Sequence, residues 1–300
     1  MTFSIVARDP GSGALGVAAQ TGMFAVGALV PWARPGVGAV ATQGIVEPAY
    51  GPRCLDAMQA GASSPDALAG AQATDPAGLL RQVRQVGVVS ADGSVAAVTG
   101  ERCIDHAGHL LGDGFAVQAN MMASPDAWPA MAAAFGASAE SFPRRLLAAL
   151  GAGQAAGGDA RGKMAAALIV VDGQRCDPWA GRLVDLRIDR SNDPLGDLRR
   201  LLDASEAHDG FKRAAKALFA GNGDTALAHV GQALATLPEE ENLRFLRARA
   251  LLATGDTDGG RSELQSLIMT RPTWEIIVRS LAAKGLIALP QSLSVDTLLH

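Results

Sequence analysis

The first part of the chain alternates apolar and polar side chains in the way that β-strands do. In residues 2–8 the apolar Phe3, Ile5 and Ala7 alternate with the polar Thr2, Ser4 and Arg8. A second apolar run at 14–20 follows the turn sequence Asp-Pro-Gly-Ser-Gly at 9–13. A third run covers residues 37–43 and ends at Gly44. Alternation with a period of two predicts strands, and proline with glycine predicts the turn between them. We therefore expect a strand hairpin at the N-terminus, followed by a third strand.

The next part of the chain predicts an α+β protein, because strands are grouped at its ends and helices lie between them. Residues 31–36, with two prolines and a glycine, predict a connection. Helices are expected from Gly51, from 64 to about 75, at 125–135 and at 142–150, and strands at 85–90, 95–99, 115–121, 165–171 and 183–188. A parallel βαβ fold would place a helix between most successive strands. The grouping therefore favours a layered α+β sandwich.

After residue 193 the strand pattern ends, and the sequence predicts helices separated by turn residues. The segment 217–224, with Ala-Leu and Gly-Asp at its ends, recurs at 250–256. The offset of about 33 residues is close to the tetratricopeptide period of about 34. Two repeats and a final helix are too few to be stable without a neighbouring surface. We expect two domains, at residues 1–204 and at residues 205–300.

Composition and charge narrow the classes of function. Of the 300 residues, 48% are apolar, which is enough to bury a large core. A formal charge of −4 with scattered Lys and Arg argues against nucleic acid as a partner. The start MTFSIVARDP lacks the pattern of a signal peptide, and no stretch of about 20 residues is free of charges and breakers. We expect a cytoplasmic protein without a membrane contact, and the sequence leaves homo-oligomer formation open.

No metal or other cofactor is expected. The three cysteines, Cys54, Cys103 and Cys176, lack a Cys-x-x-Cys pair, which favours reduced structural thiols. Cys103 lies near His106 and His109 in the sequence. A helix or a strand does not easily point all three side chains at one ion, and a fourth ligand is not evident.

Ordered motifs across about two thirds of the chain resemble one bacterial family. They include Thr-Phe-Ser-Ile-Val-Ala at 2–7, Val-Pro-Trp-Ala-Arg-Pro-Gly-Val-Gly-Ala-Val-Ala-Thr-Gln at 30–43, Gly-Gly-Asp at 157–159 and Val-Asp-Leu-Arg at 184–187. The chain thus resembles the domain of unknown function 1028, within the N-terminal-nucleophile (Ntn) hydrolase superfamily. The resemblance implies a four-layer αββα sandwich and hydrolysis of an amide bond. The tail, with Pro-Thr-Trp at 272–274 and Lys-Gly-Leu at 284–286, resembles a module that is often attached to this family and is labelled as peptidoglycan-binding.

Thr2 is the candidate nucleophile once Met1 is removed. A free N-terminal threonine carries a hydroxyl and an α-amine, with a reference pKa of ~7.7–8.0, on one residue. The amine then acts as the base for its own hydroxyl. A small second residue is also common simply because it permits removal of Met1, so the assignment depends on the family context.

Such a nucleophile also needs a cation, an oxyanion donor and an orienting acceptor. Arg34 lies at about the sequence distance from Thr2 at which proteasome subunits, which residues 2–44 distantly resemble, carry a catalytic lysine. Gly44 resembles the glycine whose N–H stabilises the oxyanion in that superfamily, and Asp159 is a candidate to orient the amine. The alternatives are an ordinary loop arginine, a tight turn and a turn cap. We expect all three residues to lie near Thr2.

Substrate contacts are expected from Gln43, Gln118 and Asn120. Gln118 and Asn120 lie at the end of a predicted strand, where their amides either bind a substrate amide or form a buried, satisfied polar pair. Glu47 departs from the family pattern, in which we expect a neutral residue, and Ala119 stands where glycine is usual. These departures bear on substrate contacts more than on the nucleophile.

Two hypotheses about function follow. In the first, the chain is an amidase or a peptidase that acts on a small amide or peptide substrate through an ester on Thr2. In the second, it is a catalytically silent Ntn-like scaffold whose helical tail binds a peptide, a protein or a muropeptide. A substitution at Thr2 distinguishes them, and the sequence does not identify the amide that is cleaved.

Overall fold

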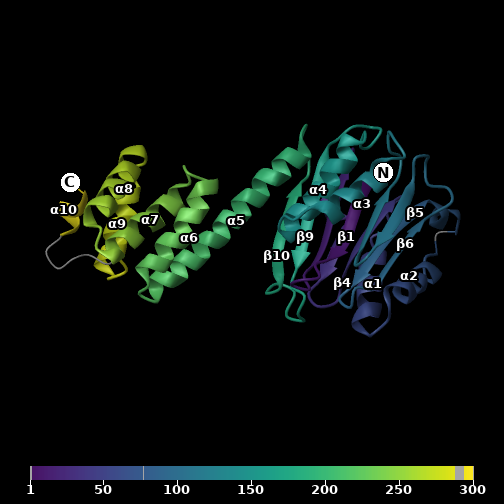
Figure 1. Cartoon of the computed structure of the whole chain (residues 1–300), viewed down its shortest axis with the longest axis horizontal. Helices are drawn as coiled ribbons and strands as arrows, with labels where there is room; N and C mark the ends of the chain where they lie inside the picture. Colours follow the sequence, from purple (N-terminus) through teal and green to yellow (C-terminus); the bar gives the residue numbers. More distant parts are fainter. Residues whose placement is uncertain (1, 77, 288–293, 300) are drawn as a thin grey trace. The chain divides into compact units, whose positions relative to one another are not determined.

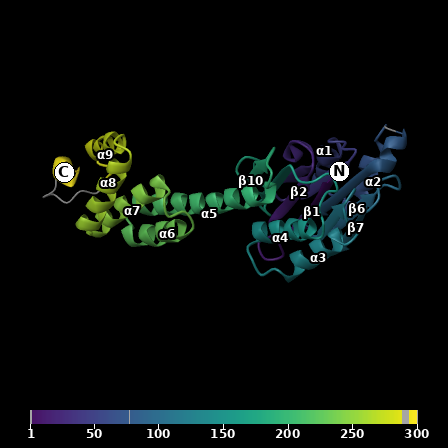
Figure 2. The ribbon, with the colours of Figure 1, turned by 90° about the horizontal axis from the view of Figure 1, so that it is seen from above.

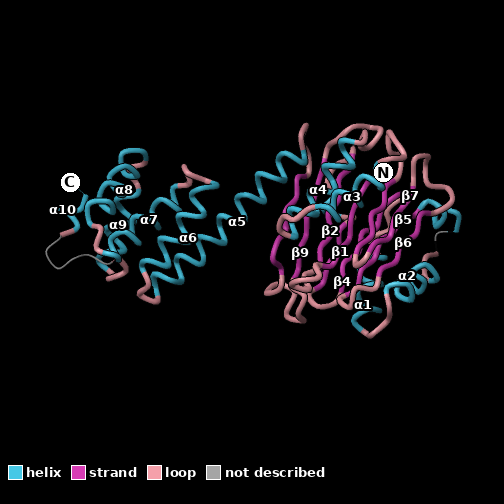
Figure 3. Tube along the Cα trace, viewed as in Figure 1, coloured by secondary structure: helices cyan, strands magenta, loops and turns pink. Residues whose placement is uncertain are grey.

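The computed structural model describes residues 2–76, 78–287 and 294–299. The chain falls into two compact units that divide between Leu202 and Asp203. The first unit combines helices with antiparallel sheets, and the second is helical (Figures 1 and 3). The predicted α+β class and the helical C-terminal region are confirmed. The division falls within one helix, α5 (Pro194–Phe219), and the tail as a separable domain stays a prediction.

Two antiparallel sheets form the centre of the first unit. The larger sheet has six strands in the order β10-β9-β2-β1-β8-β7, and the smaller has four in the order β3-β4-β5-β6. The larger sheet consists of β1 (Thr2–Arg8), β2 (Leu15–Thr21), β7 (Gly108–Gly112), β8 (Phe115–Ala119), β9 (Ala165–Val171) and β10 (Arg182–Ile188). The smaller sheet consists of β3 (Pro31–Arg34), β4 (Gly38–Gly44), β5 (Arg84–Ser90) and β6 (Val95–Thr99). Strand β1, which carries Thr2, therefore lies inside its sheet, between β2 and β8.

The sequence pattern does not predict strands β3 and β7. Strand β3 forms where we expect a connection, because it is an edge strand and Pro31 is its first residue, a position that tolerates proline. Strand β7 is an edge strand of the larger sheet and pairs with β8. Strand β8 ends at Ala119, before the expected end at Met121, where the backbone has a φ of 52° that a strand does not accommodate.

Helices cover the outer faces of both sheets, as Figure 2 shows for α1 and α2 on one side and α3 and α4 on the other. Their bounds are α1 (Tyr50–Gln59), α2 (Ser64–Ala73), α3 (Ala127–Ala137) and α4 (Phe142–Ala155), and η1 (Val26–Ala28) and η2 (Gly78–Val83) are short 3-10 helices. The Ser63 side chain caps α2 by accepting a hydrogen bond from the Asp66 N–H. The helix that the sequence predicts from residue 64 therefore has its cap at Ser63.

Three clusters of buried apolar side chains join these elements. One packs α3 and α4 on the larger sheet, one fills the space between the sheets, and one packs α1 and α2 on the smaller sheet. Members are Phe3, Ile5, Met131 and Leu146 in the first, Val17 and Val89 in the second, and Val40, Val88, Tyr50 and Leu68 in the third. Both sheets thus bury apolar surface on both faces, which is the main force that holds the unit together.

The side chains of β1 point alternately to two of these clusters. Phe3 and Ile5 belong to the cluster under α3 and α4, whereas Val6 belongs to the cluster between the sheets. Thr2 and Ser4 are four and two positions before Val6, so they face the smaller sheet as Val6 does. The polar start of β1 is thereby directed toward the end of β4.

The second unit contains the part of α5 after Leu202, followed by shorter helices. They are α6 (Gly223–Thr236), α7 (Glu241–Thr254), α8 (Thr257–Thr270), α9 (Trp274–Ala283) and α10 (Val295–Leu299). Asn222 and Asp256 cap α6 and α8, which are one repeat apart. Two apolar clusters, one including Leu243 and the other Leu264, pack these helices together. No helix in the described part of the chain is long and apolar enough to cross a bilayer.

Candidate functional site

Thr2 begins β1 and is held firmly by its neighbours. It is 4% exposed and pairs with Thr21 across β1 and β2. Its carbonyl oxygen accepts hydrogen bonds from Gln43 Nε2 at 2.9 Å and from the Asn120 N–H at 3.2 Å. A terminal residue anchored in this way lacks the disorder that is usual at chain ends. Met1, which precedes it, lies outside the described residues.

Thr2 lines a small apolar cavity. The cavity has a volume of about 140 Å³, and its walls include Thr2, Thr21, Val26, Val30, Gly44 and Val46. Among the described residues that line it, none is ionisable. Met23 and Phe24 also line it and are 55% and 66% exposed, so the cavity presents apolar surface to solvent.

Gly44 ends β4 in a conformation that favours glycine. Its φ is 85°, and a Cβ at this position would collide with the Val83 carbonyl oxygen. The Ile45 N–H donates to Val83 O at 3.2 Å, whereas the Thr42 N–H donates to Val30 O at 3.0 Å. Because N–H groups alternate between the two sides of a strand, the Gly44 N–H points to the same side as that of Thr42. This is the side on which Val30 lines the cavity.

A cluster of neutral polar side chains next to Thr2 joins the two sheets. We call it the amide cluster, and its members are Ser4, Gln43, Gln85, Gln118 and Asn120, each at most 1% exposed. Gln43 Nε2 donates to Gln85 Oε1 at 2.7 Å, and Ser4 Oγ donates to Gln43 Oε1 at 2.6 Å. Gln118 Nε2 donates to Ser4 Oγ, and Asn120 Nδ2 donates to Gln85 Oε1, both at 2.7 Å. These bonds fix β1 and β8 against the smaller sheet.

Of the three expected substrate contacts, Gln43 lines the cavity, and Gln118 and Asn120 lie in the amide cluster without lining it. Gly87 of β5 leaves the space for Gln118, because a Cβ at Gly87 would collide with the Gln118 amide. The amide N–H groups of Gln118 and Asn120 donate within the cluster, whereas their side-chain oxygens are buried without a hydrogen-bond partner among the described residues. The alternative of a buried, satisfied polar pair is therefore met only in part, and contact of these residues with a substrate stays a prediction.

Asp159 and Arg161 form an ion pair beside the strand partner of Thr2. Asp159 Oδ2 accepts hydrogen bonds from Arg161 Nη2 at 2.7 Å and from the Gly22 N–H at 2.8 Å. Arg161 Nη2 also donates to Thr21 Oγ1 at 3.4 Å. Burial alone would raise the pKa of Asp159, but the hydrogen bonds from Arg161 and Gly22 outweigh burial and hold that pKa below its usual value. Asp159 is thus linked to Thr2 through Arg161 and Thr21.

The structure does not bring Arg34 to the cavity. Arg34 ends β3 and pairs with Gly38, at the opposite end of β4 from Gly44. These ends are six positions apart (44 minus 38), which is about 20 Å at ~3.3 Å per strand residue. The Arg34 guanidinium instead bonds to α1, 2.9 Å from Asp56 Oδ1 and 2.5 Å from Gln59 Oε1. Distance counted along the chain does not show which end of a hairpin a residue occupies.

Cys103, His106 and His109 each bond to a different partner. Cys103 Sγ lies 3.7 Å from Arg84 O, His106 Nδ1 lies 2.9 Å from Met122 O, and His109 Nδ1 lies 2.9 Å from Thr99 Oγ1. Burial lowers the pKa of His109. Over the residues that the structure describes, no group of three or more His, Cys, Asp or Glu side chains is placed to hold a metal ion.

Sequence reasoning missed Ser4, Gln85 and Arg161 as parts of this region. A signal existed for the first two, because a polar side chain within a doubly buried apolar strand needs a partner. Ser4 stands between Phe3 and Ile5, and Gln85 opens an otherwise apolar run. Arg161 lies in a loop, and a spacing of two residues in a loop does not predict that its side chain contacts Asp159.

Comparison with known proteins identifies the family of the chain and the repeats in its tail. A tetratricopeptide-repeat model matches residues 217–285, which confirms the repeat predicted in the tail. No curated protein matches the chain. The crystal structure of a protein from Silicibacter pomeroyi is similar, with 34% identity and a TM-score of 0.61 over 68% of this chain and 85% of that chain. Its title names the family of unknown function DUF1028, whose model matches residues 2–198 here, and the chain therefore belongs to that family.

Proposed function

We propose that the chain is an Ntn hydrolase that cleaves an amide bond through an ester on Thr2. The observation that carries the proposal is Thr2 itself, which starts an inner strand and shares the walls of a cavity with Gly44. The succession of helix pair, sheet, sheet and helix pair supports the four-layer αββα sandwich that this superfamily requires. Family membership supplies no activity by itself.

The proposed chemistry uses the two functional groups of Thr2. Removal of Met1 frees the α-amine, which accepts the Oγ proton as Oγ attacks the carbonyl carbon of the amide. The C–N bond breaks, the proton passes from the α-amine to the leaving nitrogen, and an ester remains on Thr2. Water then attacks the ester and gives a proton to the α-amine. That proton returns to Oγ as the carboxylic acid leaves.

Gly44 is the proposed oxyanion donor. Its N–H points to the cavity side of β4, which supports this role, because a carbonyl oxygen bound beside Thr2 would develop negative charge there. Such a donor, fixed before the reaction begins, typically contributes about 10²- to 10³-fold to the rate. The donor is a backbone N–H, so no substitution other than proline removes it. A mutation that tests its role therefore has to displace the N–H.

Arg161 is the cation that we assign to this site in place of Arg34. A positive charge near an amine favours its neutral form, which is the form that accepts a proton. Asp159 holds the Arg161 guanidinium by two hydrogen bonds, from Nε at 3.1 Å and from Nη2 at 2.7 Å. This bidentate contact fixes the direction of the guanidinium beside Thr21.

The cavity indicates the class of substrate. A volume of about 140 Å³ with apolar walls suits an aliphatic side chain of moderate size next to the scissile bond. A charged side chain would lose its hydration there without gaining a partner. The substrate that we propose is a small amide or peptide with an aliphatic residue on its acyl side.

Intact mass and a covalent probe test the proposal. We expect purified protein to begin at Thr2, and an aliphatic β-lactone to acylate Oγ with opening of its ring, so that the mass rises by the whole reagent. Thr2→Ala keeps the fold and takes no adduct, whereas Thr2→Ser and Thr2→Cys retain part of the reactivity. If Thr2→Ala with Met1 absent takes the adduct as fast as the wild type does, the Ntn mechanism is wrong.

A second proposal, the silent scaffold that binds through its tail, is favoured by two pockets in the second unit. One of about 540 Å³ is lined by residues including His208 and Phe211, and one of about 500 Å³ by residues including Arg271 and Trp274. Tetratricopeptide-like repeats indicate a capacity for protein interaction. Calorimetric titration of the full chain with a muropeptide and with an unrelated peptide tests this function. Binding by a protein whose Thr2 is unreactive would favour it over hydrolysis.

A further inference from the structure

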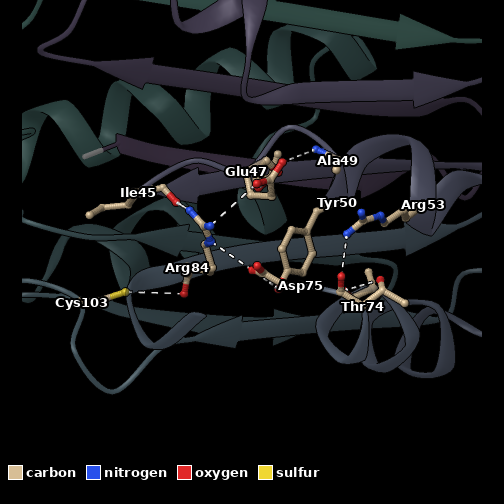
Figure 4. Close-up of polar contacts among 11 residues, drawn as sticks. Ile45, Glu47, Ala49, Tyr50, Arg53, Thr74, Asp75, Arg84 and Cys103 are labelled. Atoms are coloured by element: carbon tan, nitrogen blue, oxygen red, sulfur yellow. Dashed lines mark hydrogen bonds and ion pairs between the residues drawn. The ribbon is translucent and has the colours of Figure 1, made fainter. Parts of the chain in front are cut away.

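A buried ion pair lies close to the cavity but outside the machinery described above (Figure 4). Arg84 begins β5 and pairs with Gly44 across β4 and β5. Arg84 Nε lies 3.2 Å from Asp75 Oδ2, and Tyr50 Oη donates to the same oxygen at 3.2 Å. The Arg84, Asp75 and Tyr50 side chains are all buried. We call these three residues the arginine cluster.

Arg84 contacts the start and the middle of the loop between β4 and α1, and it is linked to the end of the loop through Asp75 (Figure 4). At the start of the loop, Arg84 Nη1 donates to Ile45 O. In its middle, Nη2 lies 3.8 Å from Glu47 Oε2. At its end, Asp75 links Arg84 to Tyr50, the first residue of α1. One side chain thus holds the segment that connects Gly44 to α1.

Glu47 is held inside this loop by its own hydrogen bonds. Its Oε1 accepts a hydrogen bond from the Ala49 N–H at 3.1 Å, and its carbonyl oxygen accepts one from Thr42 Oγ1 at 3.1 Å. Val46, the residue before it, lines the cavity. The departure from the family pattern at Glu47 therefore supplies a partner for Arg84 and a brace for the loop.

An ion pair is a costly way to hold a loop. Burying a guanidinium and a carboxylate requires removing both from water, and apolar side chains of similar volume often stabilise a protein as well or better. The guanidinium does offer a rigid, planar fork of donors that fixes the direction of its partners. A need for fixed direction is expected where a backbone N–H must meet a developing charge.

We propose that Arg84 is a positioning residue that fixes the segment from Gly44 to Val46, and with it the oxyanion N–H and one wall of the cavity. The inference rests on the proposed function. Arg84 then governs the rate at which Thr2 is acylated and the size of the side chain that the cavity accepts, without contacting the substrate itself.

The test compares variants in their acylation by two β-lactones, one with a methyl and one with an isobutyl side chain, followed by intact mass. Arg84→Met removes the fork of donors and keeps a long side chain, and Arg84→Lys restores the charge. Arg34→Met is the matched control, because Arg34 bonds to α1 directly and lies at the other end of β4. All variants are compared in the full chain, with folding checked by circular dichroism.

We expect the maximal acylation rate to fall about 10- to 100-fold in Arg84→Met, because a displaced donor costs less than the 10²- to 10³-fold loss on removing one. The preference for the isobutyl over the methyl probe is expected to shrink. Arg84→Lys is expected to recover part of both, and Arg34→Met is expected to equal the wild type.

If Arg84→Met does not fold, Arg84→Lys and Tyr50→Phe test the positioning role in its place. Tyr50→Phe removes one hydrogen bond to Asp75. Both are expected to show smaller falls in the same rate. A reactive wild type whose folded variants keep its rate and its size preference would overturn the positioning role. A wild type with a free Thr2 that takes no adduct from either probe would overturn the proposed function itself.

Discussion

The two ends of strand β4 each lie beside an arginine that is linked to helix α1, directly for Arg34 and through Asp75 for Arg84, but the two arginines have different surroundings. At the Gly38 end, the Arg34 side chain is 28% exposed and its partner Asp56 is 69% exposed. At the Gly44 end, the Arg84 side chain is 5% exposed and its partner Asp75 is fully buried. Water screens the first pair far more than the second. Spacing along the chain predicts that Arg34 is the arginine near the cavity. Strand register and burial instead point to Arg84, which pairs with Gly44 at the cavity end of β4.

The largest difference between the two ends is expected in stability. Arg84→Met leaves the Asp75 carboxylate buried without its cation, which typically costs about 3–5 kcal/mol of unfolding free energy. Arg34→Met removes a solvated pair, for which about 0–1 kcal/mol is typical. Urea unfolding of both variants and the wild type measures the difference. Equal losses would break the comparison, because they would mean that the two pairs are solvated alike.

A smaller effect is expected from adding a methyl group at Gly44. Gly44→Ala and Gly61→Ala both place alanine at a positive φ, 85° and 101°, which costs about 1–3 kcal/mol. A Cβ at Gly44 also meets Val83 O, whereas nothing lies within 4 Å of one at Gly61. We therefore expect Gly44→Ala to lower the thermal unfolding temperature more than Gly61→Ala, and to slow β-lactone acylation while Gly61→Ala does not. An unchanged acylation rate in Gly44→Ala would argue against Gly44 as the oxyanion donor.

The smallest effect at neutral pH concerns Tyr50. Burial, together with the charge of Asp75, raises the pKa of Tyr50 from 10.0 to about 12. Because the folded pKa lies above the unfolded value, the stabilisation is fully present below pH 10 and is lost as the pH rises through about 12. Tyr50 is the one tyrosine in the sequence, so tyrosinate absorbance of the whole chain reports on it alone.

We expect the native protein to titrate near pH 12 and the urea-unfolded chain near ~10. Asp75→Asn removes one of the charges that raise the value, so its native titration is expected at lower pH than that of the wild type. If Tyr50 in the native protein titrates at nearly the same pH as in the unfolded chain, water reaches the Gly44 end of β4. That result would contradict the difference in burial between the two ends.

Local sequence pattern was enough to predict the strand that carries the nucleophile, but not the surroundings of that strand. The alternation in residues 2–8 predicts β1, and the run that ends at Gly44 predicts β4. The cavity between them could not be predicted, because it forms only when the ends of β1, β2 and β4 meet across two sheets. That meeting depends on register, which no single strand encodes.

The arginine cluster shows the same limit at single residues. The apolar pattern begins the fifth strand at Gln85, one residue after Arg84, because an arginine does not fit a buried strand unless its partner is known. Asp75 comes before Pro76, and this pair predicts only the end of a helix. Pairing the two requires β5 to lie beside β4, which brings Arg84 opposite Gly44.

The amide cluster gives the site tolerance to pH. Its five members contain no ionisable group, so their hydrogen bonds do not change between acid and alkali. Ion pairs between carboxylates and ammonium groups would be lost at acid pH or at alkaline pH, when one partner loses its charge. Strand β1 therefore keeps its register against the smaller sheet while the α-amine of Thr2 gains or loses its proton. The proton that would switch activity on or off is thereby kept apart from the bonds that maintain the scaffold, and the enzyme we propose is expected to shut down in acid before it unfolds.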